Sequence, residues 1–399
     1  MEREIINRLI NEVQAKNIII PEIVIKKGAL QQIPLYLAEG KFTKVVLVVD
    51  ENTRKAAGSS LEKLIRAEEG NSLTTIELKP NIHRQVIADE QTLIQLFVEV
   101  PNEADIIIAV GSGTIHDVVR FVSYKMNIPF ISVPTAASVD GFTSKGAPLI
   151  FRGFKETVQT ASPLAVFADI DILKAAPRKM TAAGFGDIVG KFTSLLDWKI
   201  SHLVANEPYN NLAADLTRVS LEACVNHVHK IAENDEDGLK ILIQSLIESG
   251  LVMLILDFSR PASGSEHHLS HYWEMEQLKS NKKQLLHGAK VGVATTIIID
   301  LYKQTFDDLD INRLASDDVH MEKFIANWLK IKQLIDELPN ADVVRNLLEE
   351  VGGPTTSKEL NITDHLVSKS LNEAYHLRDR CTGLKLINYF KKNDINFPI

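Results

Sequence analysis

The sequence has very little cysteine: only two of its 399 residues, Cys224 and Cys381, are of this type. They lie far apart and form no CxxC pair, which excludes a disulfide framework and indicates a reducing compartment. The N-terminal residues Met1 to Ile5 include charged side chains and no apolar h-region, so no signal peptide is expected. Together these absences predict a cytoplasmic protein.

Long apolar runs and blocks of like charge are also absent. The longest apolar run, near residues 251–256, is too short to cross a bilayer, so no membrane span is expected. The 44 basic and 52 acidic residues give a formal charge of -8 and are dispersed along the chain, which argues against a nucleic-acid surface. A small basic pocket for an anionic substrate remains compatible with this composition.

Apolar segments and helical patterns alternate through the first 135 or so residues. Expected strands are an edge strand within 18–30 and the runs 45–49, 72–78, 105–110 and 128–133, and expected helices cover 53–67 and 87–98. This alternation is typical of a doubly wound parallel sheet, an α/β fold. Two further short strands are expected at 148–151 and 163–169.

The second half of the sequence has a different pattern. From about Lys179 apolar residues recur at helical spacing, as in 188–204, 212–231, 239–256 and 284–302. At 45% hydrophobic residues the chain can bury a large core divided between two domains. We therefore expect a Rossmann-like α/β domain over 1–177 and an all-helical domain over 178–399.

A glycine-rich turn follows the most apolar expected strand. Gly111-Ser112-Gly113-Thr114 separates that strand from a helical pattern beginning near His116. Backbone N–H groups at such a helix start can bind a phosphate or pyrophosphate. A tight turn without a ligand is an equally acceptable interpretation, because short glycine motifs are weak signals.

Two other strand ends add candidates for the same edge of the sheet. The loop from Thr135 to Asp140 carries small hydroxyl residues and one carboxylate, and it has no bulk to block a flat ligand. Asp50 closes an earlier strand and could accept a hydrogen bond from a ribose hydroxyl, or it could be an ordinary turn residue. Ligands of doubly wound sheets bind beyond the carboxyl ends of the strands.

The helical half contains a possible metal site. His267 and His271 are spaced i,i+4 on one expected helix face, and His287 follows twenty residues after His267. Asp187 with two of these histidines would form a two-imidazole, one-carboxylate site with an open position. Such a site suits Zn, Ni or Fe(II) acting as a Lewis acid on a carbonyl or alkoxide oxygen.

Each part of this set also has a simpler interpretation. Asp187 and Lys191 could form an i,i+4 helix ion pair, His287 could be a helix C-cap, and His267 to His271 could be a polar helix face. Glycines beside Asp187 and His287 permit close approach of backbone or ligand, which favours the site.

Several segments resemble the polyol and iron-containing alcohol dehydrogenase superfamily, which includes 3-dehydroquinate synthase. They are GSGTIHDVVRF, SVPTAASVDGFTSKGAPL, GFGDIVGK, SGSEHHLSH and LHGAKVGVAT, in the right order over most of the chain. Within the superfamily they are most similar to the glycerol-1-phosphate dehydrogenase family of the bacterial AraM type. The resemblance implies reversible NAD(P)H-dependent reduction of dihydroxyacetone phosphate to sn-glycerol 1-phosphate, and a homodimer.

The resemblance also implies roles for matching residues. Metal ligands would be Asp187, His267 and His287. Asp140, Asp187 and His271 would contact the substrate, and Asp187 and His271 would be the catalytic residues. The cofactor, NAD(H) or NADP(H), would contact Asp50, Gly113, Thr114, Ile115, His116, Asp117, Thr135, Ala136, Ala137, Ser138 and Ser144. The metal would be one divalent ion, Ni, Zn or Fe. The sequence departs from the family pattern at His116, where a hydrophobic residue is usual.

The substrate phosphate needs cationic or N–H partners. Lys145, Lys191 and Lys290 are candidates, although a solvated lysine is the favoured interpretation of each one taken singly. The competing hypotheses are an unphosphorylated polyol as substrate, a lyase of the dehydroquinate synthase kind, and a non-enzymatic nucleotide-binding protein. The lyase family has a glutamate and extra basic residues around its metal where this chain has GFGD, and the non-enzymatic hypothesis conflicts with the full ligand set.

Overall fold

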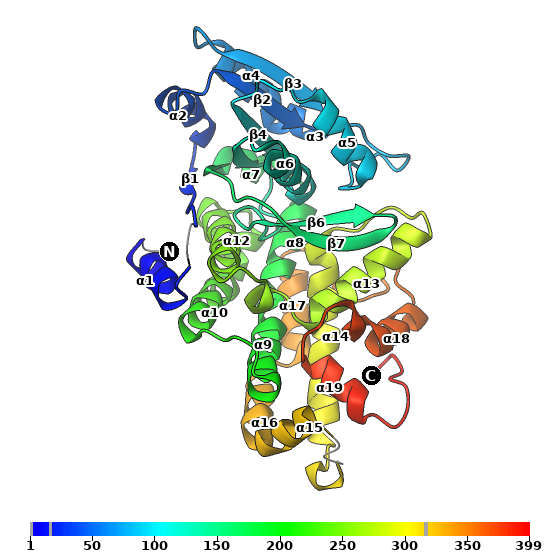
Figure 1. Ribbon diagram of the computed structural model, residues 1–399. Coiled ribbons are helices and arrows are strands. Elements are labelled where there is room, and N and C mark those ends of the chain that lie inside the picture. The colour runs from blue at the N-terminus through cyan, green and yellow to red at the C-terminus, as the bar shows by residue number, and fades with distance from the viewer. Residues whose placement is uncertain (1–2, 16–17, 315–317) are drawn as a thin grey trace.

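The computed structural model describes residues 3–15, 18–314 and 318–399. A six-stranded sheet and its helices occupy the upper part of the molecule, and a body of helices occupies the lower part (Figure 1). The strand order is β1-β8-β5-β4-β2-β3, and every neighbouring pair is parallel. The expected doubly wound α/β architecture with a helical second half is confirmed.

Strand bounds follow the apolar runs of the sequence. The sheet strands are β1 (Glu22–Lys26), β2 (Lys44–Val49), β3 (Ser72–Glu77), β4 (Ile106–Gly111), β5 (Phe130–Pro134) and β8 (Ala165–Asp169). β1 lies at an edge, as expected from Pro21. Alternate residues of β2 and β4 face two different cores, so both faces of the sheet are covered.

Helices of the α/β part cover those two faces. They are α2 (Ile33–Glu39), α3 (Glu51–Thr53), α4 (Ser59–Arg66), α5 (Glu90–Glu99), α6 (Gly113–Met126) and α7 (Ile170–Ala175). The helix expected from residue 87 begins at Glu90, because the Asp89 carboxylate accepts a hydrogen bond from Thr92 N at 3.0 Å and caps it.

The structure contains one strand, β7 (Phe154–Gln159), that the sequence analysis does not predict. β7 pairs antiparallel with β6 (Gly146–Phe151) in a separate two-stranded sheet. Its residues FKETVQ alternate between exposed and half-buried positions and include charged side chains, so no continuous apolar run marks it. This hairpin lies between the main sheet and the helical body (Figure 1).

Among described residues beyond Asp169, regular structure is entirely helical. The main helices are α8 (Arg178–Val189), α9 (Lys191–Ala205), α10 (Asn211–Asn226), α11 (Val228–Ala232), α12 (Glu236–Leu256), α13 (Ser265–Lys279), α14 (His287–Asp307), α15 (Val319–Ala326), α16 (Trp328–Asp336), α17 (Ala341–Glu350), α18 (Asp364–Glu373) and α19 (Gly383–Phe390). α12 is long and apolar enough to cross a membrane, but 72% of its most apolar window is buried inside the molecule. That burial is typical of a core helix.

The division at residue 177 remains a prediction. α8 begins at Arg178, the first residue assigned to the second domain. The N-terminal helix α1 (Arg3–Glu12) crosses this division, because Ile6 and Leu9 are buried in the same core as the C-terminal helices.

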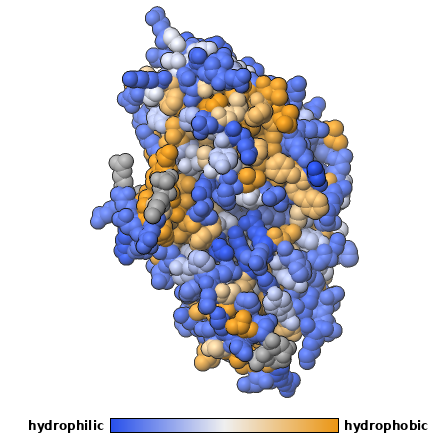
Figure 2. Space-filling model, in the orientation of Figure 1, coloured by the Kyte–Doolittle hydropathy of each residue, from blue (hydrophilic) through white to orange (hydrophobic). Residues whose placement is uncertain are grey.

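Apolar side chains also gather on the upper right of the surface in Figure 2, over the region of α5. On this helix Ile94, Phe97 and Val98 are 61%, 46% and 74% exposed.

Candidate active site

Glycine allows two helices of the helical body to touch through their backbones. A Cβ placed on Gly288 would lie 1.7 Å from Ala183 O, and one on Gly186 would lie 2.2 Å from Gly288 O. Only glycine fits at these contacts between α8 and α14. The neighbouring residues Asp187 and His287 are therefore brought toward each other. His287 opens α14 rather than closing a helix, so its interpretation as a C-cap is wrong.

Asp187 and two histidines converge from three helices. The Oδ1 atom of Asp187 lies 3.5 Å from His267 Nε2 and 4.0 Å from His287 Nε2. One ligand atom from each residue lies within 4.8 Å of the others. Asp187 Oδ2 accepts a hydrogen bond from Asp140 N at 3.0 Å, whereas Oδ1 is buried and without a hydrogen-bond partner among the described residues. A buried carboxylate oxygen is normally satisfied, and a divalent cation would satisfy this one.

A second carboxylate orients His267. Glu266 Oε1 lies 2.7 Å from His267 Nδ1 and accepts a hydrogen bond from Gly264 N at 2.6 Å, while Oε2 accepts from Thr193 Oγ1 at 2.6 Å. The imidazole is held by its Nδ1 side with Nε2 toward Asp187. Metal-ligating histidines usually have such a carboxylate partner.

The charges of Asp187 and His287 suit a cation. Burial alone would lower the pKa of His267, but Asp187 and Glu266 raise it, which favours the protonated form of His267 while no metal is bound. Burial alone would raise the pKa of Asp187, but Lys191, His267 and His287 hold it well below its usual range. Burial lowers the pKa of His287 to about 3, so its imidazole is neutral at physiological pH. An ionised carboxylate beside a neutral imidazole is a donor set that first-row divalent metals prefer.

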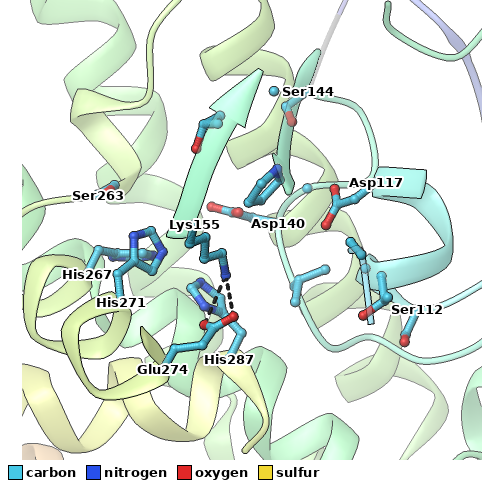
Figure 3. A pocket seen from close by; sticks show the side chains of 18 of the residues that line it. Ser112, Asp117, Asp140, Ser144, Lys155, Ser263, His267, His271, Glu274 and His287 are labelled. Atoms are coloured by element: carbon cyan, nitrogen blue, oxygen red, sulfur yellow. Dashed lines mark hydrogen bonds and ion pairs between the residues drawn. The ribbon is translucent and has the colours of Figure 1, made fainter. Parts of the chain in front are cut away.

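His267 and His287 border a hollow between the two parts of the molecule, and Asp187 is buried behind them. In Figure 3 the three histidines lie opposite Ser112 and Asp117, with Asp140 between them. Ser112 and Asp117 belong to the glycine-rich turn and the first part of α6, at the carboxyl end of β4. The expected phosphate-binding turn and the expected metal ligands thus share one hollow.

The family model described as iron-containing alcohol dehydrogenase matches residues 24–177. Glycerol-1-phosphate dehydrogenase [NAD(P)+] of Geobacillus thermodenitrificans is 48% identical over 378 residues, which cover 93% of each chain. The enzyme of the same name from Geobacillus stearothermophilus is 45% identical over 375 residues, covering 92% of each chain.

The chain belongs to the glycerol-1-phosphate dehydrogenase family. Its fold is also that of solved polyol dehydrogenases. Glycerol dehydrogenase from Schizosaccharomyces pombe superposes with a TM-score of 0.65 at 18% identity, covering 94% of this chain and 86% of the other. The resemblance inferred from the sequence motifs is confirmed.

In this family member, the residues expected to bind the dinucleotide fall into two groups. Gly113, Thr114, Asp117, Ser138 and Ser144 line the hollow. The N-cap side chain Ser112 makes no capping hydrogen bond, so it does not occupy the N–H groups of the first turn of α6. Burial raises the pKa of Asp117 to about 7, although Arg120 opposes the shift.

The remaining dinucleotide candidates lie beside or behind this lining. His116 is buried, its Nδ1 lies 2.9 Å from Ser112 O, and burial lowers its pKa to about 3. Ile115 packs against Gly111. Thr135, Ala136 and Ala137 are buried in the loop after β5. Asp50 caps α3 by accepting hydrogen bonds from Asn52 N and Thr53 N, both at 2.8 Å.

Asp140 lines the hollow and is joined to a buried lysine. Lys191 Nζ donates to Asp140 Oδ2 at 2.7 Å and lies 3.6 Å from Asp187 Oδ1, so a simple Asp187–Lys191 helix pair does not describe this site. Ser249 Oγ also donates to Asp140 Oδ2, at 2.8 Å. Burial and the charge of Asp187 raise the pKa of Asp140, and Lys191 opposes the shift.

The segment from His267 to His271 is not a solvated polar face. His268 and Ser270 are fully buried, and His271 lines the hollow. The His271 ring lies 6.0 Å from that of His267 and 5.8 Å from that of His287, centroid to centroid. Burial, with smaller contributions from Lys155 and Arg378, lowers the pKa of His271 well below its usual value.

The lysines expected to bind phosphate are paired with carboxylates. Lys191 and Lys290 are 1% exposed, and Lys290 Nζ donates to Glu274 Oε2 at 2.6 Å. Lys145 lines the hollow but lies 2.7 Å from Asp257 Oδ1. Lys191 and Lys290 are not among the residues that line the hollow, so a contact of either with a substrate phosphate stays a prediction.

Sequence reasoning missed three charged residues of the hollow, Lys155, Glu274 and Arg378. Lys155 lies on the unrecognised strand β7, and Glu274 lies seven residues after His267 on the same helix. That spacing of two helical turns places Glu274 on the same face as His267 and could have identified it. For Lys155 and Arg378 no local pattern signals the site.

Proposed function

We propose that this protein reduces dihydroxyacetone phosphate to sn-glycerol 1-phosphate with NADH or NADPH, reversibly. Membership of the glycerol-1-phosphate dehydrogenase family supports the reaction. The observation that carries the proposal is the buried Asp187 Oδ1, which has no hydrogen-bond partner among the described residues and lies beside His267 and His287. These two histidines face the glycine-rich turn across the hollow.

Asp187, His267 and His287 would hold one divalent ion: Ni, Zn or Fe. When bound, the ion supplies a Lewis acid that stabilises the negative charge developing on the ketone oxygen during hydride transfer. The chain's own contribution is to fix these three side chains before substrate arrives. Glu266 holds the His267 ring at Nδ1, and the glycine contacts between α8 and α14 set the position of His287.

The dinucleotide would bind on the opposite wall. Free backbone N–H groups at the start of α6 would bind its pyrophosphate, and Asp50 would accept from the adenosine ribose through the oxygen that does not cap α3. The further proposed contacts are Gly113, Thr114, Ile115, His116, Asp117, Thr135, Ala136, Ala137, Ser138 and Ser144. The buried members shape this wall, and those on the hollow touch the ligand.

His271 and Asp140 would contact the substrate. The depressed pKa of His271 leaves a neutral imidazole whose N–H can donate to a substrate hydroxyl and whose other nitrogen can accept a proton. Asp140 accepts from Lys191 and Ser249 through Oδ2, which leaves Oδ1 for a substrate hydroxyl. A cytoplasmic location and a homodimer remain predictions.

The test is oxidation of NADH and NADPH by metal-stripped protein after adding Ni, Zn or Fe(II). Dihydroxyacetone phosphate is compared with dihydroxyacetone, and the chirality of the product is determined. We expect metal-dependent oxidation with the phosphorylated ketone and sn-glycerol 1-phosphate as product. Faster turnover of the bare ketone would indicate a polyol dehydrogenase instead. No oxidation with any of these metals would contradict the proposal.

A further inference from the structure

Arg378, near the C-terminus, lines the hollow and Arg380 lies beside it, and neither has an acidic partner within ion-pair distance among the described residues. Arg378 donates to Ser259 Oγ at 3.4 Å and to Thr157 Oγ1 at 3.3 Å. Arg380 donates to Ser259 Oγ at 2.9 Å and to Ser263 O. A half-buried cation without a counterion is costly, so this arrangement favours binding of an anion.

Lys155 adds positive charge beside Arg378. Lys155 and Thr157 are two residues apart on β7, so their side chains lie on the same face of the strand, and Thr157 accepts from Arg378. Lys155 Nζ lies 2.9 Å from Glu274 Oε1, and Lys290 Nζ lies 2.6 Å from Glu274 Oε2. One carboxylate serves two lysines, so positive charge is left over at this wall.

A buried hydroxyl lies in the same corner. Ser263 is 6% exposed, its Oγ has no hydrogen-bond partner among described residues, and it lines the hollow. Its own carbonyl accepts from Arg380, which ties the serine to the arginine pair. A buried hydroxyl without a partner loses free energy that a ligand oxygen would restore.

The corner adjoins the metal ligands. His271 contributes to the same wall as Arg378 and Lys155, and Ser263 precedes His267 by four residues. Figure 3 shows Lys155 and Ser263 on the histidine side of the hollow. In dihydroxyacetone phosphate only one carbon and one oxygen separate the carbonyl carbon from phosphorus. A ketone oxygen near Asp187, His267 and His287 therefore requires the phosphate to lie close by.

We infer that Arg378, Lys155 and the Ser263 hydroxyl bind the phosphate of the substrate, with Arg380 positioning Ser263 and Ser259. The inference rests on the proposed function. Arg378 would offer two N–H donors to the phosphate oxygens, Lys155 a third, and Ser263 an uncharged fourth. These residues would make the site specific for a phosphorylated ketone over the bare one.

The electrostatics of the arginines agree with this assignment. Burial lowers the pKa of Arg378. Burial, together with Arg378 and Arg260, lowers the pKa of Arg380 to about 9. A phosphate dianion placed between these groups would reverse both shifts.

The test uses the full-length, metal-loaded enzyme with Arg378→Gln. We expect the ratio of kcat/KM for dihydroxyacetone phosphate to that for dihydroxyacetone to fall about tenfold or more, the size of a lost charged hydrogen bond. Inorganic phosphate, used as a competitive inhibitor against dihydroxyacetone phosphate, should bind more weakly by a similar factor. Arg378→Lys should recover part of both losses. The KM for NADPH is measured as well, because an arginine that binds a phosphate of the cofactor would change this KM and leave the ratio unchanged.

Ser263→Ala provides a second variant that removes no internal hydrogen bond, so the fold should tolerate it. It should lower the same ratio roughly threefold or more.

Arg313→Gln, which removes an 83% exposed guanidinium far from the hollow, is the matched control for charge. The inference is overturned if Arg378→Gln and Ser263→Ala both leave the ratio within the range of Arg313→Gln. It is also overturned if only the KM for NADPH changes. Failure of the wild type to reduce dihydroxyacetone phosphate would instead contradict the proposed function.

Discussion

Two buried aspartates ten residues apart, Asp187 on α8 and Asp197 on α9, differ in how completely their oxygens are satisfied. Asp197 accepts from Tyr302 OH at 2.7 Å and Gly383 N at 2.8 Å through Oδ1, and from Ser265 N at 2.7 Å through Oδ2. Asp187 accepts one backbone N–H through Oδ2, and its Oδ1 has no hydrogen-bond partner among described residues. Both side chains are almost completely buried, so burial alone does not separate a ligand from a structural residue.

The number of carboxylate oxygens that accept a hydrogen bond does distinguish Asp187 from Asp197. Asp197 ties the start of α13 to the start of α19 and to Tyr302 on α14, which is a structural role. Asp187 faces two imidazoles with an oxygen left over, which is the arrangement of a metal ligand. Three substitutions test this contrast.

Asp187→Asn should produce the largest effect. The amide is a poor metal ligand, so we expect loss of the bound ion and a fall in kcat/KM of roughly a thousandfold or more. The metal-free protein should also lose stability, by about 1–3 kcal/mol, because Lys191, His267 and His287 lose the carboxylate charge that they hold in its ionised form. Metal content, turnover and urea unfolding measure the three quantities. Retention of a large part of the activity would remove Asp187 from the ligand set.

Asp197→Ala should lower the stability and leave metal binding intact. Three buried donors lose their acceptor, so the free energy of unfolding should fall by about 2–4 kcal/mol. The folded fraction should still bind one metal ion per chain. Urea unfolding with metal analysis of the folded protein checks both expectations. If Asp197→Ala removes the metal without lowering stability, the contrast between the two aspartates is wrong.

Glu274→Gln sharpens the comparison with a third buried carboxylate, one paired with lysines. Burial opposes ionisation of Glu274, but Lys155 and Lys290 outweigh it and lower its pKa far below the usual range. Because the folded-state pKa lies below the unfolded one, the carboxylate stabilises the fold above pH ~4, and this contribution is lost as the pH falls toward the folded-state pKa.

The variant should therefore be less stable than wild type at pH 7, by about 1–3 kcal/mol. The difference should narrow as the pH falls below about 4. Urea unfolding at several pH values measures it, with Glu349→Gln, an exposed acid on α17, as the control. An equal difference at pH 7 and pH 3.5 would contradict the ion-pair explanation.

The sequence predicts the part of the molecule whose signals are local. Buried parallel strands appear as β-branched runs, and the glycines beside Asp187 and His287 mark the backbone contact that joins α8 to α14. His267 and His287 are predictable from the i,i+4 spacing of His267 and His271 and from the glycine that follows His287.

The remaining features depend on tertiary contacts. β7 forms only by pairing with β6 in a two-stranded hairpin. Its residue Lys155 gains a role only because the hairpin contacts α13, where Lys155 pairs with Glu274. Arg378 lies more than a hundred residues from its partners Ser259 and Thr157. For Lys191 and Lys290, sequence spacing does not reveal that each is buried against a carboxylate.

The most direct measurement is a cobalt titration of metal-free wild type, His287→Ala and Asp187→Asn, followed by visible absorption. We predict one Co²⁺ per wild-type chain with the intense d–d bands of a four- or five-coordinate ion, and loss of those bands in both variants while their far-ultraviolet circular dichroism is retained. Unchanged cobalt binding in His287→Ala and Asp187→Asn would contradict the assignment of the metal site to Asp187, His267 and His287.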